Sequence, residues 1–179
     1  MSDGADILER ALAALNALCA ERPWRVVTLR DVAEKAGLPL ADLYREANSK
    51  TALIDHLGER LDAAALTTAA TASDDPHDRL FDAAMARIEA MEPWRAVLAG
   101  VDGSAVVPLL PHLPKAARAI LEAAGVEATP PRLAAMTLVW ARIVQVWRAD
   151  EGALNRTMAE IDKRLKQLRT RLSAIGQGF

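Results

Sequence analysis

The sequence is poor in the residues that build disulfide frameworks, cysteine-based metal clusters and β-sheets. Cys19 is the only cysteine, which excludes an internal disulfide and a cysteine cluster, and we expect it to be a small buried residue of the first helix. Aromatic residues make up 4% of the chain and runs of β-branched residues are scarce, whereas alanine and leucine dominate. This composition predicts an all-α protein.

Signatures of catalysis are absent as well. The three histidines, His56, His77 and His112, stand in separate segments of the chain. The sequence contains neither a helical pair of histidines with metal-ligand spacing nor a glycine-rich phosphate loop. We therefore predict no enzymatic activity, no catalytic residue, no metal ion and no cofactor.

No hydrophobic run reaches the length of a membrane span. The longest, residues 133–147, is too short for a transmembrane helix and contains Arg142 and Gln145. The opening residues MSDGAD show no basic and apolar signal region. We expect a soluble, cytoplasmic protein.

Apolar periodicity, capping residues and prolines divide the chain into a series of helices. Thr28 is the expected N-cap of a short helix with Asp31 at its N3 position, Gly37 ends that helix, and Ser49 caps a later, long helix. The expected helices are residues 5–20, 29–36, 39–47, 50–71, 76–91, 93–100, 104–111, 115–124, 130–149 and 155–175. We expect a head at residues 1–50 and a body at residues 51–179, whose first helix (50–71) links the two.

Two of the short helices in the head form a helix-turn-helix. They meet at Gly37-Leu38, Ala33 is small where they cross, and Val32, Leu38 and Leu43 form the apolar seam between them. In such a unit the second helix lies in the major groove of DNA, and its exposed residues touch bases and phosphates. The pattern therefore predicts a DNA-binding head.

The segments Thr28–Ala33, Ala36–Leu38, Leu43–Tyr44 and Ser49–Lys50 follow one another in a spacing that resembles the N-terminal pattern of the tetracycline-repressor (TetR) family of one-component regulators. The resemblance covers roughly residues 5–60. It implies that Thr28 and Tyr44 touch the DNA backbone and that Lys50, at a helix N-terminus, contacts a phosphate. The candidate DNA-binding residues are Thr28, Arg30, Leu40, Ala41, Asp42, Tyr44, Arg45 and Lys50.

Three positions of the second helix depart from the family pattern. Asp42 replaces a small hydroxyl residue, Glu46 replaces His or Tyr, and Ala47 replaces Phe, and we expect all three to face outward. Carboxylates on a DNA-facing surface weaken binding because they repel phosphates. The net charge of the chain is −2, and residues 1–60 contain eight basic and ten acidic residues, so the overall charge does not favour nucleic acid either.

Other contacts can offset these acids. A carboxylate can accept a hydrogen bond from cytosine N4 in the major groove. Arg45 or Arg30 can pair with the acids, and Leu40 is either a contact for a thymine methyl group or ordinary surface.

The last two helices carry the features of a dimer interface. The final helix has a heptad seam, which packs either on the chain's own core or on a partner: Met158, Ile161, Leu165, Leu168, Leu172 and Ile175. The preceding helix is apolar nearly all round and has to be covered on both sides. Since TetR regulators pair through their last two helices, the resemblance implies a homodimer through helices 130–149 and 155–175.

The middle of the body is rich in large apolar residues that serve either as core or as the lining of a ligand pocket. The candidate ligand-binding residues are Phe81, Met85, Trp94, Leu110, Met136 and Trp140. The proline-broken segment 102–114 is a candidate lid. Arg142 and Gln145 either fix a ligand or pair across the dimer.

A second resemblance concerns the C-terminal part of the chain. The runs Trp147–Asp150 and Thr157–Leu165 resemble the ubiquinone-biosynthesis accessory proteins, which share the TetR fold and bind lipids and isoprenes. We expect a transcriptional repressor that binds operator DNA as a dimer and is released by a small hydrophobic ligand. The alternative is a lipid- or isoprene-binding protein whose head no longer binds DNA. The residues name neither ligand nor operator, and they are also compatible with an activator.

Overall fold

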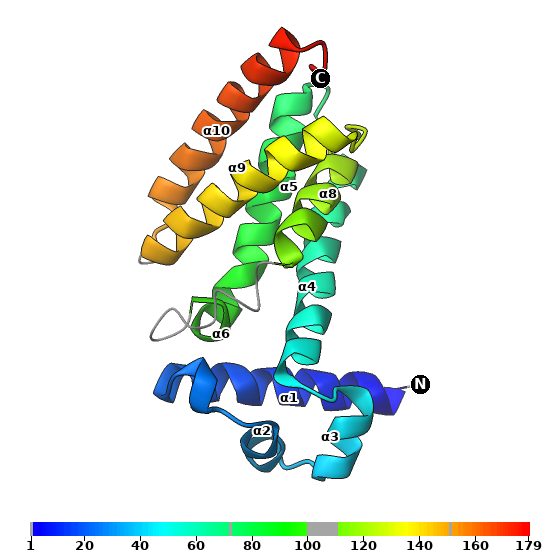
Figure 1. Ribbon diagram of the computed structural model, residues 1–179, viewed down its shortest axis with the longest axis vertical. Coiled ribbons are helices and arrows are strands. Elements are labelled where there is room, and N and C mark those ends of the chain that lie inside the picture. The colour runs from blue at the N-terminus through cyan, green and yellow to red at the C-terminus, as the bar shows by residue number, and fades with distance from the viewer. Residues whose placement is uncertain (1, 72, 100–110, 151) are drawn as a thin grey trace. The chain divides into compact units, whose positions relative to one another are not determined.

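The computed structural model describes residues 2–71, 73–99, 111–150 and 152–179, and all regular elements within these ranges are helical, as the composition predicts (Figure 1). The α-helices are α1 (Ser2–Glu21), α2 (Leu29–Ala36), α3 (Leu40–Glu46), α4 (Lys50–Thr67), α5 (Pro76–Met91), α6 (Arg95–Ala99), α8 (His112–Ala123), α9 (Pro130–Ala149) and α10 (Asn155–Ala174). Short 3-10 helices are η1 (Trp24–Val26), η2 (Thr68–Thr71) and η3 (Glu92–Trp94). The expected helix 104–111 lies almost entirely outside the described residues.

Helix boundaries that depend on caps are predicted correctly. Helices α2, α5 and α9 have the expected bounds, whereas α4 gives way to η2 after Thr67. Helix α8 begins at His112 and not at residue 115, because Pro114 lies in its first turn, where the missing N–H of proline has no helical partner to lose. None of the helices in the described ranges is long and apolar enough to cross a membrane.

The helices group into two compact units, and the division falls within α4 after Glu59. The first unit contains the described residues up to Glu59 and the segment from Pro93 to Ala99, and the second contains the rest. Asn16 of α1 joins the two stretches of the first unit: its amide donates to the Pro93 carbonyl (2.9 Å), and its Oδ1 accepts from the Val97 N–H (3.0 Å). Helix α6 packs on α1 within this first unit.

In the first unit, α1 packs on α2 and α3 (Figure 1). Thr28 and Asp31 form the expected capping box: Thr28 Oγ1 accepts from the Asp31 N–H (3.1 Å), and Asp31 Oδ2 accepts from the Thr28 N–H (2.7 Å). The bond from the Thr28 backbone holds the pKa of the Asp31 carboxyl below its usual value. Gly37 ends α2 with φ of 64°, and Ser49 Oγ accepts from the Ala52 N–H (3.1 Å). All three expected capping residues, Thr28, Gly37 and Ser49, are confirmed.

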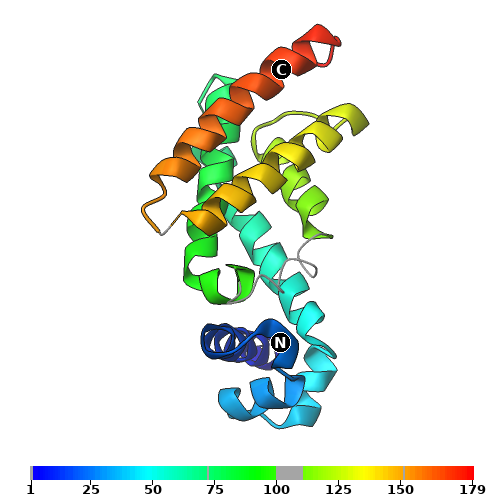
Figure 2. The same ribbon diagram turned by 60° about the vertical axis from the view of Figure 1, so that its left-hand side comes forward.

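In the second unit, α9 lies between α8 and α10, and α5 packs on α8 and α10 (Figures 1 and 2). Four side chains of the predicted heptad seam are buried inside the chain: Ile161, Leu165, Leu168 and Leu172. Met158 and Ile175, at the two ends of the seam, are exposed. The central seam therefore packs on the chain's own core, which is one of the two uses expected for it.

A buried ion pair links α4 and α5 within the second unit. Arg87 Nε donates to Asp62 Oδ1 (2.9 Å), and the Arg87 side chain is only 5% exposed. The guanidinium carbon lies 5.1 Å from the centre of the Trp140 ring, a cation–π contact. Burial lowers the pKa of Arg87, although the nearby Asp62 carboxylate opposes this effect.

We predict that Asp62→Ala destabilises the second unit by about 3–5 kcal/mol, because the substitution leaves the Arg87 charge buried without its partner. Urea unfolding followed by circular dichroism measures the loss. The double variant Asp62→Ala with Arg87→Met removes the buried charge and should recover part of the stability. Equal stability of Asp62→Ala and the wild type would contradict a buried ion pair.

Candidate nucleic-acid interface

Helix α3 is attached to the first unit by one fully buried side chain, Leu43. An α-helix has 3.6 residues per turn, so residues two positions away from Leu43 lie on the opposite side. These residues are Ala41 and Arg45, and both are exposed. Leu40 and Tyr44 follow one flank of the helix, and Asp42 and Glu46 follow the other.

The eight candidate DNA-binding residues lie on or beside α2 and α3. Six are exposed: Thr28, Arg30, Leu40, Ala41, Tyr44 and Arg45. Asp42 and Lys50 are half-buried. Tyr44 and Leu40 are 60% and 40% exposed, and they lie four residues apart on one flank of α3. The Thr28 cap uses an oxygen lone pair, so capping does not consume the hydroxyl hydrogen that a phosphate contact requires.

The two carboxylates on α3 have different surroundings. Asp42 Oδ1 accepts a hydrogen bond from Arg45 Nη2 (2.8 Å). Glu46 Oε1 lies 3.6 Å from Arg45 Nε, and the same carboxylate approaches Gly4 of α1 so closely that an added Cβ there would lie 2.9 Å from Glu46 Oε2. Glu46 therefore leans toward α1, while Asp42 is held by Arg45.

The expected outward position of Ala47 is wrong, since this residue is only 2% exposed. Ala47 is the C-cap of α3 and follows the buried Leu43 by four residues, so it lies on the same, inner side as Leu43, and its N–H donates to the Leu43 carbonyl (2.7 Å). Its departure from the family pattern is therefore a change in the core and not in the DNA-facing surface.

Lys50 has a contact within the chain that the sequence does not reveal. Its ammonium group donates to the Trp24 carbonyl (2.6 Å) and lies 4.5 Å from the centre of the Trp24 ring. Burial lowers the pKa of Lys50. Lysine carries three N–H donors, so this bond leaves others for a phosphate. Trp24 lies 26 residues before Lys50, so no local pattern predicts this contact.

We predict that Lys50→Met lowers the free energy of unfolding by about 1–3 kcal/mol, because it removes a charge-assisted hydrogen bond and a cation–π contact. Chemical denaturation in the absence of DNA measures the change. Lys35→Met is the matched control, because the Lys35 ammonium has an exposed carboxylate partner, Glu21 at 3.5 Å. The same stability for both variants would contradict a structural role for Lys50.

The candidate ligand-binding residues that the structure describes belong to both units. Met85, Met136 and Trp140 are buried core residues of the second unit, and Phe81 is half-buried there. Trp94 is half-buried and belongs to the first unit. Leu110 lies outside the described residues, as does most of the candidate lid.

An open cavity of about 440 Å³ lies in the second unit between α4, α8 and α9. Its wall combines apolar and charged side chains: Asp62, Leu66, Pro114, Lys115, Arg118, Ala119, Glu122 and Leu133. Asp62 brings the buried Arg87 pair to the edge of this space. No sequence pattern predicts this set of residues, because they come from three helices and are far apart in the chain.

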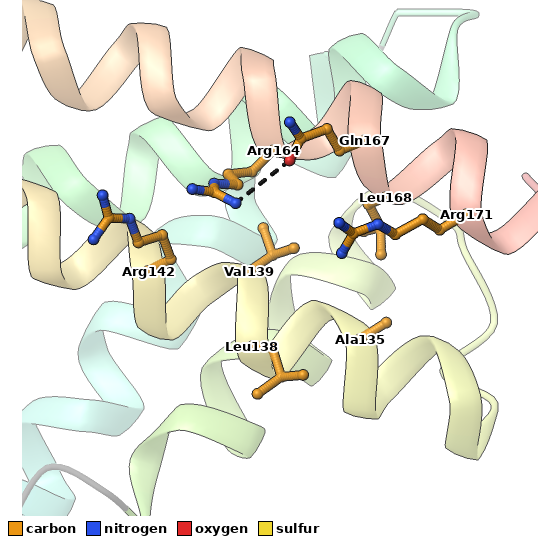
Figure 3. A pocket seen from close by; sticks show the side chains of 8 residues that line it. All are labelled: Ala135, Leu138, Val139, Arg142, Arg164, Gln167, Leu168 and Arg171. Carbon is orange, nitrogen blue, oxygen red and sulfur yellow. Dashed lines mark hydrogen bonds between the residues drawn. The ribbon is translucent and has the colours of Figure 1, made fainter.

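A smaller cleft of about 150 Å³ separates α9 from α10 (Figure 3). Figure 3 shows three arginines set along it, with Val139 and Leu168 between the helices. The residues that line it are Ala135, Leu138, Val139, Arg142, Arg164, Gln167, Leu168 and Arg171. Arg164 Nη1 donates to Gln167 Oε1 at 3.4 Å, the bond drawn in the figure.

One carboxylate connects α9 and α10 beside this cleft. Glu160 Oε1 accepts from Arg164 Nε (2.6 Å) and from Arg142 Nε (3.2 Å). The Arg164 bond is the main reason why the pKa of Glu160 lies below its usual value. Arg142 also donates to Gln145 (2.7 Å), so both polar residues singled out on α9 have partners within the chain. Within the described ranges, no cluster of three or more acidic, histidine or cysteine side chains is arranged to hold a metal ion.

Comparisons with known proteins agree with this geometry. Residues 11–57 match the family model of bacterial regulatory proteins of the tetR family. No curated protein matches the sequence.

Solved structures match almost the whole chain. A TetR transcriptional regulator from Rhodococcus sp. RHA1 has a TM-score of 0.64 at 19% identity, over 94% of this chain and 98% of that one. The TetR family repressor AlkX from Dietzia sp. strain DQ12-45-1b has a TM-score of 0.58 at 17% identity, over 90% and 94%. A transcriptional regulator from Rhodococcus sp. Rha1 has a TM-score of 0.56 at 21% identity, over 92% and 96%.

TetR regulators are DNA-binding transcription factors and not enzymes, which agrees with the prediction of no enzymatic activity. The chain therefore has the all-α fold of the TetR family of transcription regulators, and residues 11–57, which contain the helix-turn-helix, match that family's model.

Proposed function

We propose that the protein is a cytoplasmic one-component regulator that binds operator DNA as a homodimer and is released by a small hydrophobic ligand. The observation that carries the proposal is the outer surface of α3. Arg45 projects from α3 opposite the buried Leu43, and Leu40 and Tyr44 are exposed along one flank. The capped α2 precedes it, so the pair has the form that places a recognition helix in the major groove.

The partners of the acidic residues support DNA binding. The Arg45 guanidinium offsets the charge of Asp42, and Glu46 leans toward Gly4 of α1. The repulsion that two unpaired carboxylates would exert on phosphates is therefore reduced. Thr28 and Tyr44 are exposed on the same helix-turn-helix and are proposed contacts to the DNA backbone.

The proposed homodimer is supported by large apolar side chains that remain exposed on the last two helices. Leu138 on α9 is 74% exposed, and Met158 and Ile175 on or after α10 are 42% and 63% exposed. Exposed large apolar residues on two adjacent helices are typical of an interaction surface. A two-fold dimer also supplies two heads for two half-sites on DNA.

The ligand is proposed to bind in the second unit, in the cavity bounded by α4, α8 and α9. Leu66, Ala119 and Leu133 offer apolar contact, and Arg118 offers a polar one. One structural neighbour, AlkX, is implicated in the biodegradation of n-alkanes, which accords with an apolar ligand. Release from DNA requires that the ligand bind more tightly to the conformation that does not bind DNA.

The second candidate is a lipid- or isoprene-binding protein that does not bind DNA. The acidic residues of α3 favour it, as does the resemblance of the C-terminal runs to the ubiquinone-biosynthesis accessory proteins. Mass spectrometry of lipids that co-purify with the protein tests this candidate.

We predict salt-sensitive, sequence-selective binding to double-stranded DNA. Selection from a random duplex library, followed by fluorescence anisotropy at several salt concentrations, should give a consensus site and an affinity that falls as salt rises. Tyr44→Ala should weaken binding, whereas Lys163→Ala, an exposed residue of α10, should not. Failure of the wild type to select any sequence would sink the proposal and favour the second candidate.

We predict that Leu138→Glu converts the dimer into a monomer, because it places a carboxylate in an apolar interface. Analytical ultracentrifugation measures the change in mass. Leu66→Glu, an exposed leucine of α4, serves as the control and should remain dimeric. A wild-type chain that sediments as a monomer, or an unaffected Leu138→Glu dimer, would exclude this interface.

A further inference from the structure

The outermost polar group of α3 is a joined pair of side chains. Arg45 lies on the side of α3 opposite the buried Leu43, and its side chain is 66% exposed, so the guanidinium extends away from the core of the first unit. Asp42, three residues earlier, accepts one N–H of this guanidinium at 2.8 Å. The carboxylate and the guanidinium therefore meet a ligand together, as one unit of defined geometry.

The charge around Arg45 disfavours a phosphate as that ligand. The guanidinium lies between two carboxylates, at 2.8 Å from Asp42 and 3.6 Å from Glu46, so the three side chains carry one net negative charge. A phosphate brings a further negative charge and would be repelled. A neutral group with hydrogen-bond acceptors keeps the attraction of the guanidinium without this repulsion.

The edge of a G·C base pair has the matching pattern. In the major groove it presents two acceptors on guanine, N7 and O6, followed by one donor, the N4 amino group of cytosine. Arginine has five N–H donors, of which Asp42 takes one, and a carboxylate can accept several hydrogen bonds. Arg45 can thus donate to guanine while Asp42 accepts from cytosine.

We propose that Asp42 and Arg45 together read one G·C base pair in each half-site of the operator. An A·T pair does not fit, because the adenine N6 donor would face an Arg45 donor and the thymine O4 acceptor would face the Asp42 carboxylate. The acid that departs from the family pattern thereby becomes a specificity determinant. This inference rests on the proposed function, since it requires that the head bind DNA.

The test compares base preferences of the full-length wild type with those of Arg45→Ala and Asp42→Ala. A selected duplex is altered at each position in turn, and dissociation constants are measured by fluorescence anisotropy. For the wild type, replacing one G·C pair per half-site by A·T should weaken binding roughly 5- to 150-fold, the discrimination of a bidentate base contact. Both variants should lose the preference at this position and keep the preferences at the others.

Lys35→Ala is the matched control, because it removes an exposed cation of α2 that has a single carboxylate partner. It should retain the G·C preference. Circular dichroism melting verifies that the variants fold. Asp42→Ala should also bind unrelated duplexes more tightly than the wild type, because one repulsive charge is gone.

Two results would overturn the inference while leaving the proposed function intact. One is a uniform loss of affinity in Arg45→Ala with every base preference retained, which indicates a phosphate contact. The other is a wild-type consensus without a G·C position that responds to Arg45 or Asp42. If the wild type selects no DNA sequence at all, both the proposed function and this inference fail.

Discussion

The outer surface of α3 depends on the burial of two side chains, Leu43 within this seven-residue helix and Ala47 at its C-cap. A helix as short as α3 is not stable alone in water, because isolated helices below about 12–15 residues are marginal. Leu43 and the C-cap Ala47 bury their side chains in the first unit, where α3 packs on α1 and α2. Once these positions are fixed, the helical period determines that Arg45 is outermost and that Glu46 lies close to α1. The packing of the inner side of α3 therefore determines which side chains its outer side presents.

Local signals were sufficient for most of the fold. The caps form hydrogen bonds with residues no more than four positions away. Thr28 and Ser49 accept bonds from N–H groups at the start of a helix, and Gly37 ends one, so a short stretch of sequence contains all the partners. Long-range contacts carry no such pattern: Lys50 meets the Trp24 carbonyl 26 residues earlier, and Asn16 meets the Val97 N–H 81 residues later. For the acids of α3, the sequence offers Arg45 or Arg30 as partners, and the structure pairs Asp42 with Arg45.

The body illustrates why hydrophobic spacing alone leaves two interpretations. A 3-4 spacing predicts which side of α10 is apolar, yet it does not name the surface that covers that side. Ile161 and Leu165 are covered by the chain itself, whereas Leu138 of α9 is not. Charged residues behave similarly. Arg142 of α9 and Arg164 of α10 both donate to Glu160 of α10. The sequence shows two cations, whereas the structure shows that both are paired with one carboxylate, which connects the two helices.

The contact between Asn16 and the segment at Pro93 has a consequence for how the chain is made. The first unit is not a contiguous stretch, because α6 joins it only after the whole of α5 has been synthesised. A head that emerges from the ribosome as residues 1–59 still lacks the groups that satisfy the Asn16 amide. The last packing step of the first unit therefore waits until more than thirty further residues have been translated. A fragment that ends at residue 57, the end of the family match, would keep the helix-turn-helix, but its Asn16 side chain would be hydrated in place of its bonds to Pro93 and Val97.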